Sequence, residues 1–164
     1  MTEEIYCERL TELKREKNFL EKNLKVKITI KRKKIIIKGE PLDEYEALMV
    51  LDAINLGFSA RKSCSLKDED MIFERLNIKD HTRRKNLEIV RGRLIGTHGK
   101  TKETIEKICN CEIKIKGNIV GIIAPAESIE YITTAITNLI RGTKQTNIYK
   151  YLERINTQRK KLED

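Results

Sequence analysis

An internal repeat most constrains how this chain of 164 residues can fold. Leu20-Glu21-Lys22 in the first half matches Ile105-Glu106-Lys107 in the second, which sets an offset of 85 residues between Glu21 and Glu106. Further apolar residues coincide at the same offset: Ile28 and Ile30 with Ile113 and Ile115, and Ile35 and Ile37 with Val120 and Ile122. A fixed period of this kind indicates that one structural unit occurs twice.

Each copy is predicted to mix helices and strands, which gives an α+β fold. Alternating apolar residues predict two strands per copy, over residues 26–31 and 35–38 and again over 111–116 and 119–124. Helical spacing follows at about residues 43–55 and 128–140, directly after Pro41 and Pro125. Gly117-Asn118 is typical of a short hairpin turn, and the tail over 147–164 predicts a further helix.

The second copy carries a Gly-x-x-Gly turn, Gly96-Thr97-His98-Gly99, followed by a helical pattern. Glycines let the chain turn sharply and leave its backbone accessible, while the first N–H groups of the next helix favour an anion. Arg91, Arg93, Lys100 and Lys102 add positive charge around the turn. This combination predicts a site for phosphate groups, most simply those of a nucleic-acid backbone.

The first copy does not repeat the turn. At the same offset, Gly96 to Gly99 fall on Thr11-Glu12-Leu13-Lys14. Glu12 and Glu16 would also place negative charge where a phosphate would approach. We therefore expect the first copy to have a structural or protein-contacting role.

The net charge of +9 is concentrated in the half that holds the glycine turn. Residues 1–80 contain 17 Lys and Arg against 16 Asp and Glu, an excess of +1, whereas residues 81–164 contain 17 against 9, an excess of +8. A basic excess suits nucleic acid, an acidic protein or a membrane surface. Its coincidence with the turn favours nucleic acid.

The order strand, helix, Gly-x-x-Gly, helix, strand, strand, helix resembles the KH domain of type I (βααββα). On this resemblance, residues 86–91 would form the first strand and 93–95 a short helix, with Leu94, Ile95, Ile105 and Ile113 as the floor of a groove for unpaired bases. Such domains clamp about four single-stranded nucleotides. The implied RNA-binding residues are Arg91, Arg93, Leu94, Ile95, Gly96, Thr97, His98, Gly99, Lys100, Thr101, Lys102, Ile113, Lys114 and Lys116.

A narrower resemblance covers most of the chain. Ile54 to Ser59, Arg91 to Gly96, Gly99-Lys100-Thr101 and Ile148 to Glu153 are similar to the archaeal tandem KH-domain ribosome-assembly family known as Dim-two or partner of Nob-one. The resemblance implies binding to precursor small-subunit rRNA near its 3′ end. It also implies a PIN-domain endonuclease and the alpha subunit of initiation factor two as partners. Family members often keep the glycine turn in the first unit, and a basic residue is usual where Thr97-His98 stands.

The expected organisation is a degenerate KH-like unit over 1–65, a connecting segment over 66–85, a KH domain over 86–142 and a C-terminal helix over 143–164, with the two units packed together. Arg83-Arg84-Lys85 would extend the phosphate track. Lys31 to Lys34 is interpreted as a solvated hairpin tip, with a secondary RNA contact as the alternative. The tail helix could dock on the body or on RNA.

Several function classes are disfavoured. No carboxylate or nucleophile lies near His98, and no catalytic motif is present, so we expect a protein that is not an enzyme. Cys7, Cys64, Cys109 and Cys111 do not have zinc-ribbon spacing and are read as free thiols; we expect neither a metal nor a cofactor. No apolar run is long enough for a membrane span, and the acidic N-terminus is unlike a signal peptide, so we expect a cytoplasmic protein.

Two alternatives stay open from the sequence. The degenerate first copy and the acidic stretch at Asp43 to Glu46 would suit a protein-protein adaptor with residual RNA binding. The basic second half would also suit a general RNA-binding component of RNA degradation or transcription machinery.

Overall fold

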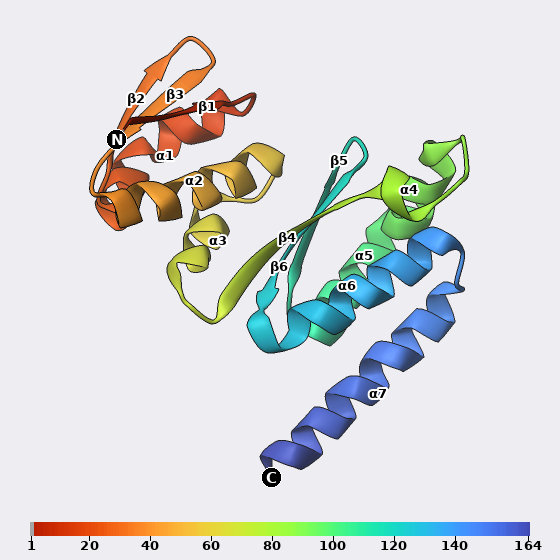
Figure 1. Ribbon diagram of the computed structural model, residues 1–164. Coiled ribbons are helices and arrows are strands. Elements are labelled where there is room, and N and C mark those ends of the chain that lie inside the picture. Colours follow the sequence, from red (N-terminus) through yellow and green to blue (C-terminus); the bar gives the residue numbers. More distant parts are fainter. Residues whose placement is uncertain (1) are drawn as a thin grey trace. The chain divides into compact units, whose positions relative to one another are not determined.

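The computed structural model describes residues 2–164 and divides into two compact units, Met1–Phe73 and Glu74–Asp164 (Figure 1). Each unit has a three-stranded sheet and helices. This confirms the expected α+β class.

The first unit has the order β1 (Thr2–Tyr6), α1 (Leu10–Leu24), β2 (Lys27–Lys31), β3 (Lys34–Lys38), α2 (Pro41–Leu56) and α3 (Ala60–Cys64). Its sheet has the strand order β1-β3-β2, with β3 antiparallel to both neighbours. The hairpin turn between β2 and β3 lies at Arg32-Lys33, whose side chains are exposed, as the sequence predicted. A short 3₁₀ helix, Ser65–Lys67, follows α3.

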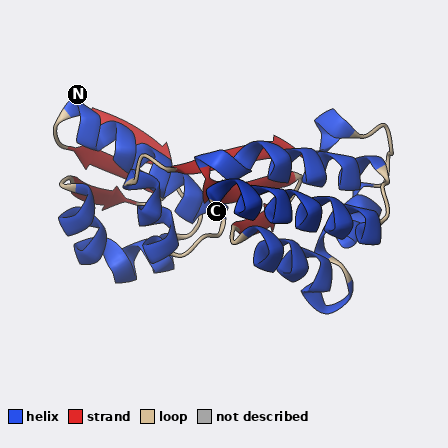
Figure 2. Ribbon diagram, turned by 90° about the horizontal axis from the view of Figure 1, so that it is seen from below, coloured by secondary structure: helices blue, strands red, loops and turns tan. Residues whose placement is uncertain are grey.

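The second unit repeats this plan with an added helix. Its strands are β4 (Met71–Asn77), which begins at the boundary of the units, β5 (Glu112–Lys116) and β6 (Ile119–Pro125). The helices are α4 (Leu87–Ile95), α5 (Lys100–Cys109), α6 (Ala126–Arg141) and α7 (Gln145–Glu163) (Figure 2). The strand order is β4-β6-β5, which corresponds strand for strand to that of the first unit.

The repeat extends to the backbone conformation. Adding the offset to the bounds of β2 and α2 gives those of β5 and α6. Three left-handed positions also recur at this offset: Lys25 and Asn110 after a helix (φ 56° and 51°), Arg32 and Gly117 in a hairpin (φ 57° and 58°), and Gly57 and Gly142 after a helix (φ 134° and 117°). Left-handed residues are used where a chain must end a helix or turn tightly, so both copies turn at equivalent places.

A glutamate joins helix to strand in each unit, which explains the repeated Glu-Lys motif. The Glu21 carboxylate accepts the backbone N–H of Ile28 at 3.2 Å, and Glu106 accepts that of Ile113 at 3.1 Å. A lysine one helical turn earlier pairs with each carboxylate: Lys17 with Glu21 at 3.7 Å and Lys102 with Glu106 at 2.7 Å. We call this arrangement the helix-strand brace.

The sequence-based assignment of the first strand of the second unit was wrong. Residues 86–91 are not a strand, because helix α4 begins at Leu87 and includes the expected short helix 93–95. The Asn86 side chain caps this helix by accepting the N–H of Glu88 at 3.2 Å. The strand is instead β4, within the segment expected to be a connection. The first unit has the single helix α1 where the second has α4, the glycine turn and α5.

The tail helix packs on the second unit. Ile148 and Leu152 of α7 are buried and join the core formed by α4, α5, α6 and the sheet, which answers the question of where this helix docks. Within the part of the chain that the structure describes, no helix combines the length and hydropathy needed to span a bilayer.

The brace predicts a measurable loss of local stability when its acceptor is removed. Glu106→Ala leaves the N–H of Ile113 without its carboxylate partner and should lower the free energy of unfolding of the second unit by about 1–3 kcal/mol. Amide hydrogen exchange at Ile113, followed by NMR, measures this directly. Glu106→Gln keeps an acceptor oxygen and serves as the control; equal exchange rates in both variants would contradict the brace.

Candidate nucleic-acid interface

The Gly-x-x-Gly segment forms a tight turn between α4 and α5. The Gly96 N–H donates to the Gly92 carbonyl at 2.8 Å and ends α4, and the Gly99 N–H donates to the Gly96 carbonyl at 3.2 Å. Gly96, His98 and Gly99 all have positive φ, at 77°, 54° and 75°. The backbone thus reverses within four residues and delivers the chain to the N-terminus of α5.

The two glycines are required for different reasons. A Cβ on Gly96 would lie 2.2 Å from Oγ1 of Thr101 and 2.7 Å from its backbone nitrogen, so no side chain fits between the turn and α5. A Cβ on Gly99 would meet nothing within 4 Å. Gly96 therefore lets the turn close on the helix, whereas Gly99 leaves its outer side open to a ligand.

The exposed residues of the turn give it a basic, accessible surface. Thr97, His98 and Lys100 are exposed. Lys100 is the first residue of α5, where the helix dipole also favours an anion. A phosphate can approach this turn without displacing a side chain.

The outer face of α4 adds an exposed apolar surface beside the turn. Ile89 is 53% exposed and Ile95 is 38% exposed, and a Cβ on Gly92, between them on the same face, would meet nothing within 4 Å. Ile95 was among the predicted RNA-binding residues, whereas Ile89 and Gly92 were not. Ile89 was missed because residues 86–91 were predicted to form a strand. The helical spacing of buried Val90 and Leu94 was the signal that could have revealed this face.

Three of the basic residues assigned to the site hold the domain together. Arg91 donates to Oδ1 of Asn118 at 2.7 Å and so fixes α4 to the β5–β6 hairpin. Arg93 donates to the carbonyl of Thr143 at 2.8 Å, and Lys102 belongs to the helix-strand brace. Their charge remains near the turn, while one guanidinium nitrogen of each arginine and the ammonium group of Lys102 bond within the unit.

Three further assigned residues are not on the surface. Leu94 and Ile113 are 2% and 1% exposed and belong to the core, as does Ile105, so the expectation that they form an exposed groove floor is corrected. Thr101 is 4% exposed and packs against Gly96. Lys114 and Lys116 are half-buried on β5, which is an edge strand and pairs only with β6 in the sheet order.

A second basic surface lies where α6 ends. An open hollow of about 440 Å³ is lined by His81, Thr82, Arg83, Arg84 and Arg141. Arg83 and Arg84 are exposed, as the proposed extension of a phosphate track requires. None of the described residues that line this hollow is acidic.

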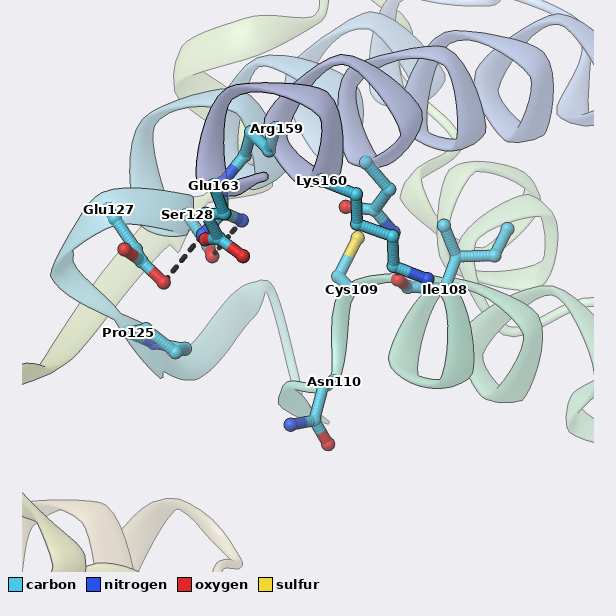
Figure 3. Close-up of a pocket in the computed structure, with 10 residues that line it drawn as sticks. Ile108, Cys109, Asn110, Pro125, Glu127, Ser128, Arg159, Lys160 and Glu163 are labelled. Atoms are coloured by element: carbon cyan, nitrogen blue, oxygen red, sulfur yellow. Dashed lines mark hydrogen bonds and ion pairs between the residues drawn. The ribbon is translucent and has the colours of Figure 1, made fainter.

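A third hollow, of about 380 Å³, lies between α7 and the ends of α5 and β6 (Figure 3). Here Arg159 forms a short ion pair with Glu127 and donates to Oγ of Ser128 at 3.1 Å, which ties α7 to α6. The hollow is therefore part of the seat of the tail helix. Its mixture of basic and acidic residues does not select an anion.

None of the described cysteines forms a disulfide. A hydrogen bond between the Cys109 and Cys111 side chains lowers the pKa of Cys109 and, together with burial, raises the pKa of Cys111. Both thiols are buried in the second unit. Among residues 2–164, no cluster of three or more His, Cys, Asp or Glu side chains is placed to hold a metal.

The family model of the eukaryotic type KH domain (KH-domain type I) matches residues 72–157. This range begins in β4 and ends in α7, so it contains the glycine turn and both helices around it. A KH domain-containing protein of Methanocaldococcus jannaschii is 30% identical over 145 residues, which cover 84% of this chain and 64% of that protein's length. An RNA-binding protein pno1 of Ixodes scapularis is 30% identical over 113 residues, 67% of this chain and 48% of its own length.

Solved structures match nearly the whole chain. Dim2p of Pyrococcus horikoshii superposes with a TM-score of 0.84 at 32% identity, covering 94% of this chain and 99% of that chain. A complex of a/eIF2alpha, aDim2p and rRNA from the same organism gives a TM-score of 0.85 at 31% identity, covering 96% and 95%. The chain therefore belongs to the KH-domain type I family and, within it, to the archaeal Dim2 and PNO1-like KH proteins.

Proposed function

We propose that this protein binds single-stranded precursor small-subunit rRNA near its 3′ end during ribosome assembly, through the second unit. The observation that carries the proposal is the Gly96–Gly99 turn at the N-terminus of α5, closed against Thr101 on one side and open at Gly99 on the other. The similarity to an aDim2p from a complex with rRNA supports the choice of RNA class.

In the proposed complex, the sugar-phosphate backbone and the bases of the RNA would contact two different surfaces. Phosphates would lie at the turn, where Lys100 and the N-terminus of α5 supply positive potential. Bases would lie against the apolar outer face of α4 formed by Ile89, Gly92 and Ile95. The free edge of β5, with Lys114 and Lys116, would supply groups that read base edges.

The basic hollow at Arg83, Arg84 and Arg141 would extend this track beyond the nucleotides held at the turn. Contacts there would be to phosphates, so they would add affinity that depends on salt more than on sequence. The bound RNA end would be held in place for a nuclease, or shielded from it. A PIN-domain endonuclease and the alpha subunit of initiation factor two are the partners we propose, the second because of the a/eIF2alpha complex.

The tip of the turn provides the first test. Replacing Thr97 and His98 together by Asp places two negative charges where phosphates would lie, and should weaken binding of a 3′ small-subunit RNA by roughly tenfold or more. Fluorescence anisotropy at two salt concentrations, with scrambled RNA alongside, measures the effect. Thr146→Asp with Asn147→Asp makes the same charge change on exposed residues of α7 and should change affinity less. Equal affinity of the two double variants would remove the turn from the interface.

The fit of the turn against α5 provides the second test. Gly96→Ala forces a Cβ into Thr101 and should abolish specific RNA binding, while the rest of the second unit stays folded. Gly117→Ala is the matched control, since Gly117 also has positive φ (58°) but its Cβ would meet nothing within 4 Å. Gly117→Ala strains a left-handed residue by about 1–2 kcal/mol. Gly96, at φ 77° and ψ 173°, lies in a region that essentially only glycine adopts, so Gly96→Ala adds a larger backbone strain to its clash with Thr101. Retention of full RNA affinity by Gly96→Ala would contradict the proposed role of the turn; circular dichroism checks folding in each case.

A further inference from the structure

Helix α2 in the first unit has an exposed apolar face. Its inner face, with Ala47, Val50 and Ile54, is buried. On the opposite side Leu42 is 68% exposed and Tyr45 is 61% exposed. A helix with apolar residues on both sides is typical of a helix that is covered on both sides.

This exposed face forms one wall of a groove. A hollow of about 320 Å³ is lined on one side by α2 residues from three successive positions one turn apart: Leu42, then Tyr45 and Glu46, then Met49. The other wall is the segment from Leu66 to Phe73, which ends in Met71, Ile72 and Phe73. The ring of Phe73 packs edge-on against buried Phe58, with ring centroids 5.9 Å apart. This second wall is therefore anchored to the core of the unit.

The rim of the groove is acidic in a protein that is basic overall. Glu46, Asp68 and Glu69 line it, and Asp68 and Glu69 are exposed. The one basic residue of the lining, Lys67, directs its ammonium group to the carbonyl of Asn23 at the end of α1. Among residues 2–164, no lysine or arginine forms an ion pair with Glu46, Asp68 or Glu69.

We propose that this groove, lined by α2 and residues 66–73, is a docking site for a basic amphipathic helix of a partner protein. Apolar side chains at one-turn spacing would enter the groove beside Leu42, Tyr45 and Met49, in the manner of helix-in-groove recognition. Lysines or arginines flanking them would meet the acidic rim, which supplies orientation and a faster encounter. The same negative charge repels RNA, so the partner and RNA would use different surfaces.

The charge of the occupant can be tested with a pair of labelled peptides of roughly 16 residues that share leucines at helical spacing and differ only in lysine or glutamate beside them. Fluorescence anisotropy with the full chain should show binding of the lysine peptide and at least roughly tenfold weaker binding of the glutamate peptide. Equal binding of the two peptides, or binding of neither, overturns the proposal.

The location is tested by variants of exposed residues that leave the core intact. Leu42→Ser with Tyr45→Ser, and separately Asp68→Lys with Glu69→Lys, should each weaken the lysine peptide by roughly tenfold. Glu130→Lys with Glu153→Lys makes the same charge change on exposed residues of the second unit and should leave affinity within roughly twofold. Unchanged affinity in the groove variants overturns the proposal. So does a concentration-dependent dimer of the wild type that Tyr45→Ser dissociates in sedimentation velocity, because the occupant would then be a second copy.

Discussion

The hydrogen bond that a strand amide donates to a helix glutamate is the interaction on which both units depend. Glu21 and Glu106 each hold the N–H of the first buried isoleucine in the following strand, and a lysine one turn earlier orients the carboxylate. The bond ties the helix to the strand that follows it in each unit. In the second unit it also fixes α5, whose N-terminus receives the glycine turn, so the position of the proposed RNA site follows from the same contact.

The two units differ in the segment that precedes the helix carrying the glutamate, which is α1 in the first unit and α5 in the second. The second unit has α4 and a turn with an open glycine, together with most of the net positive charge. The first unit has one continuous helix, α1, in this place. It also carries an apolar groove with an acidic rim, lined by α2 and residues 66–73. One repeated plan thus carries two kinds of surface: a basic turn, where we propose that phosphates bind, and an acidic groove, where we propose that a basic protein segment binds. The difference lies in the side chains and in one added helix, while the sheets keep the same strand order.

Much of this fold could be predicted from the sequence, because β2 and β5 alternate, β3 and β6 are short apolar runs next to a turn, and helices α2 and α6 begin at or after a proline. The offset of 85 residues also predicted that one unit occurs twice, and the turns of the two copies do recur at this offset. The secondary structure of residues 86–91, in the second unit, could not be predicted in this way. Leu87-Glu88-Ile89 alternates like a strand, and only the cap at Asn86 and the burial of Val90 and Leu94 show that the segment is a helix. Sequence could identify the residues of the turn, but it could not separate exposed Lys100 from Leu94 and Ile113, which the core buries, or from Arg91 and Arg93, which hold the unit together.

The most direct test of the central proposal is an NMR map of backbone amides in the full chain, recorded as single-stranded RNA of the small-subunit 3′ region is added. If the turn grips the RNA backbone, the largest shifts will fall on the amides from Gly96 to Lys100, with smaller ones along the outer face of α4 and β5. Shifts confined to the first unit, with the amides of the turn unchanged at saturation, would contradict it.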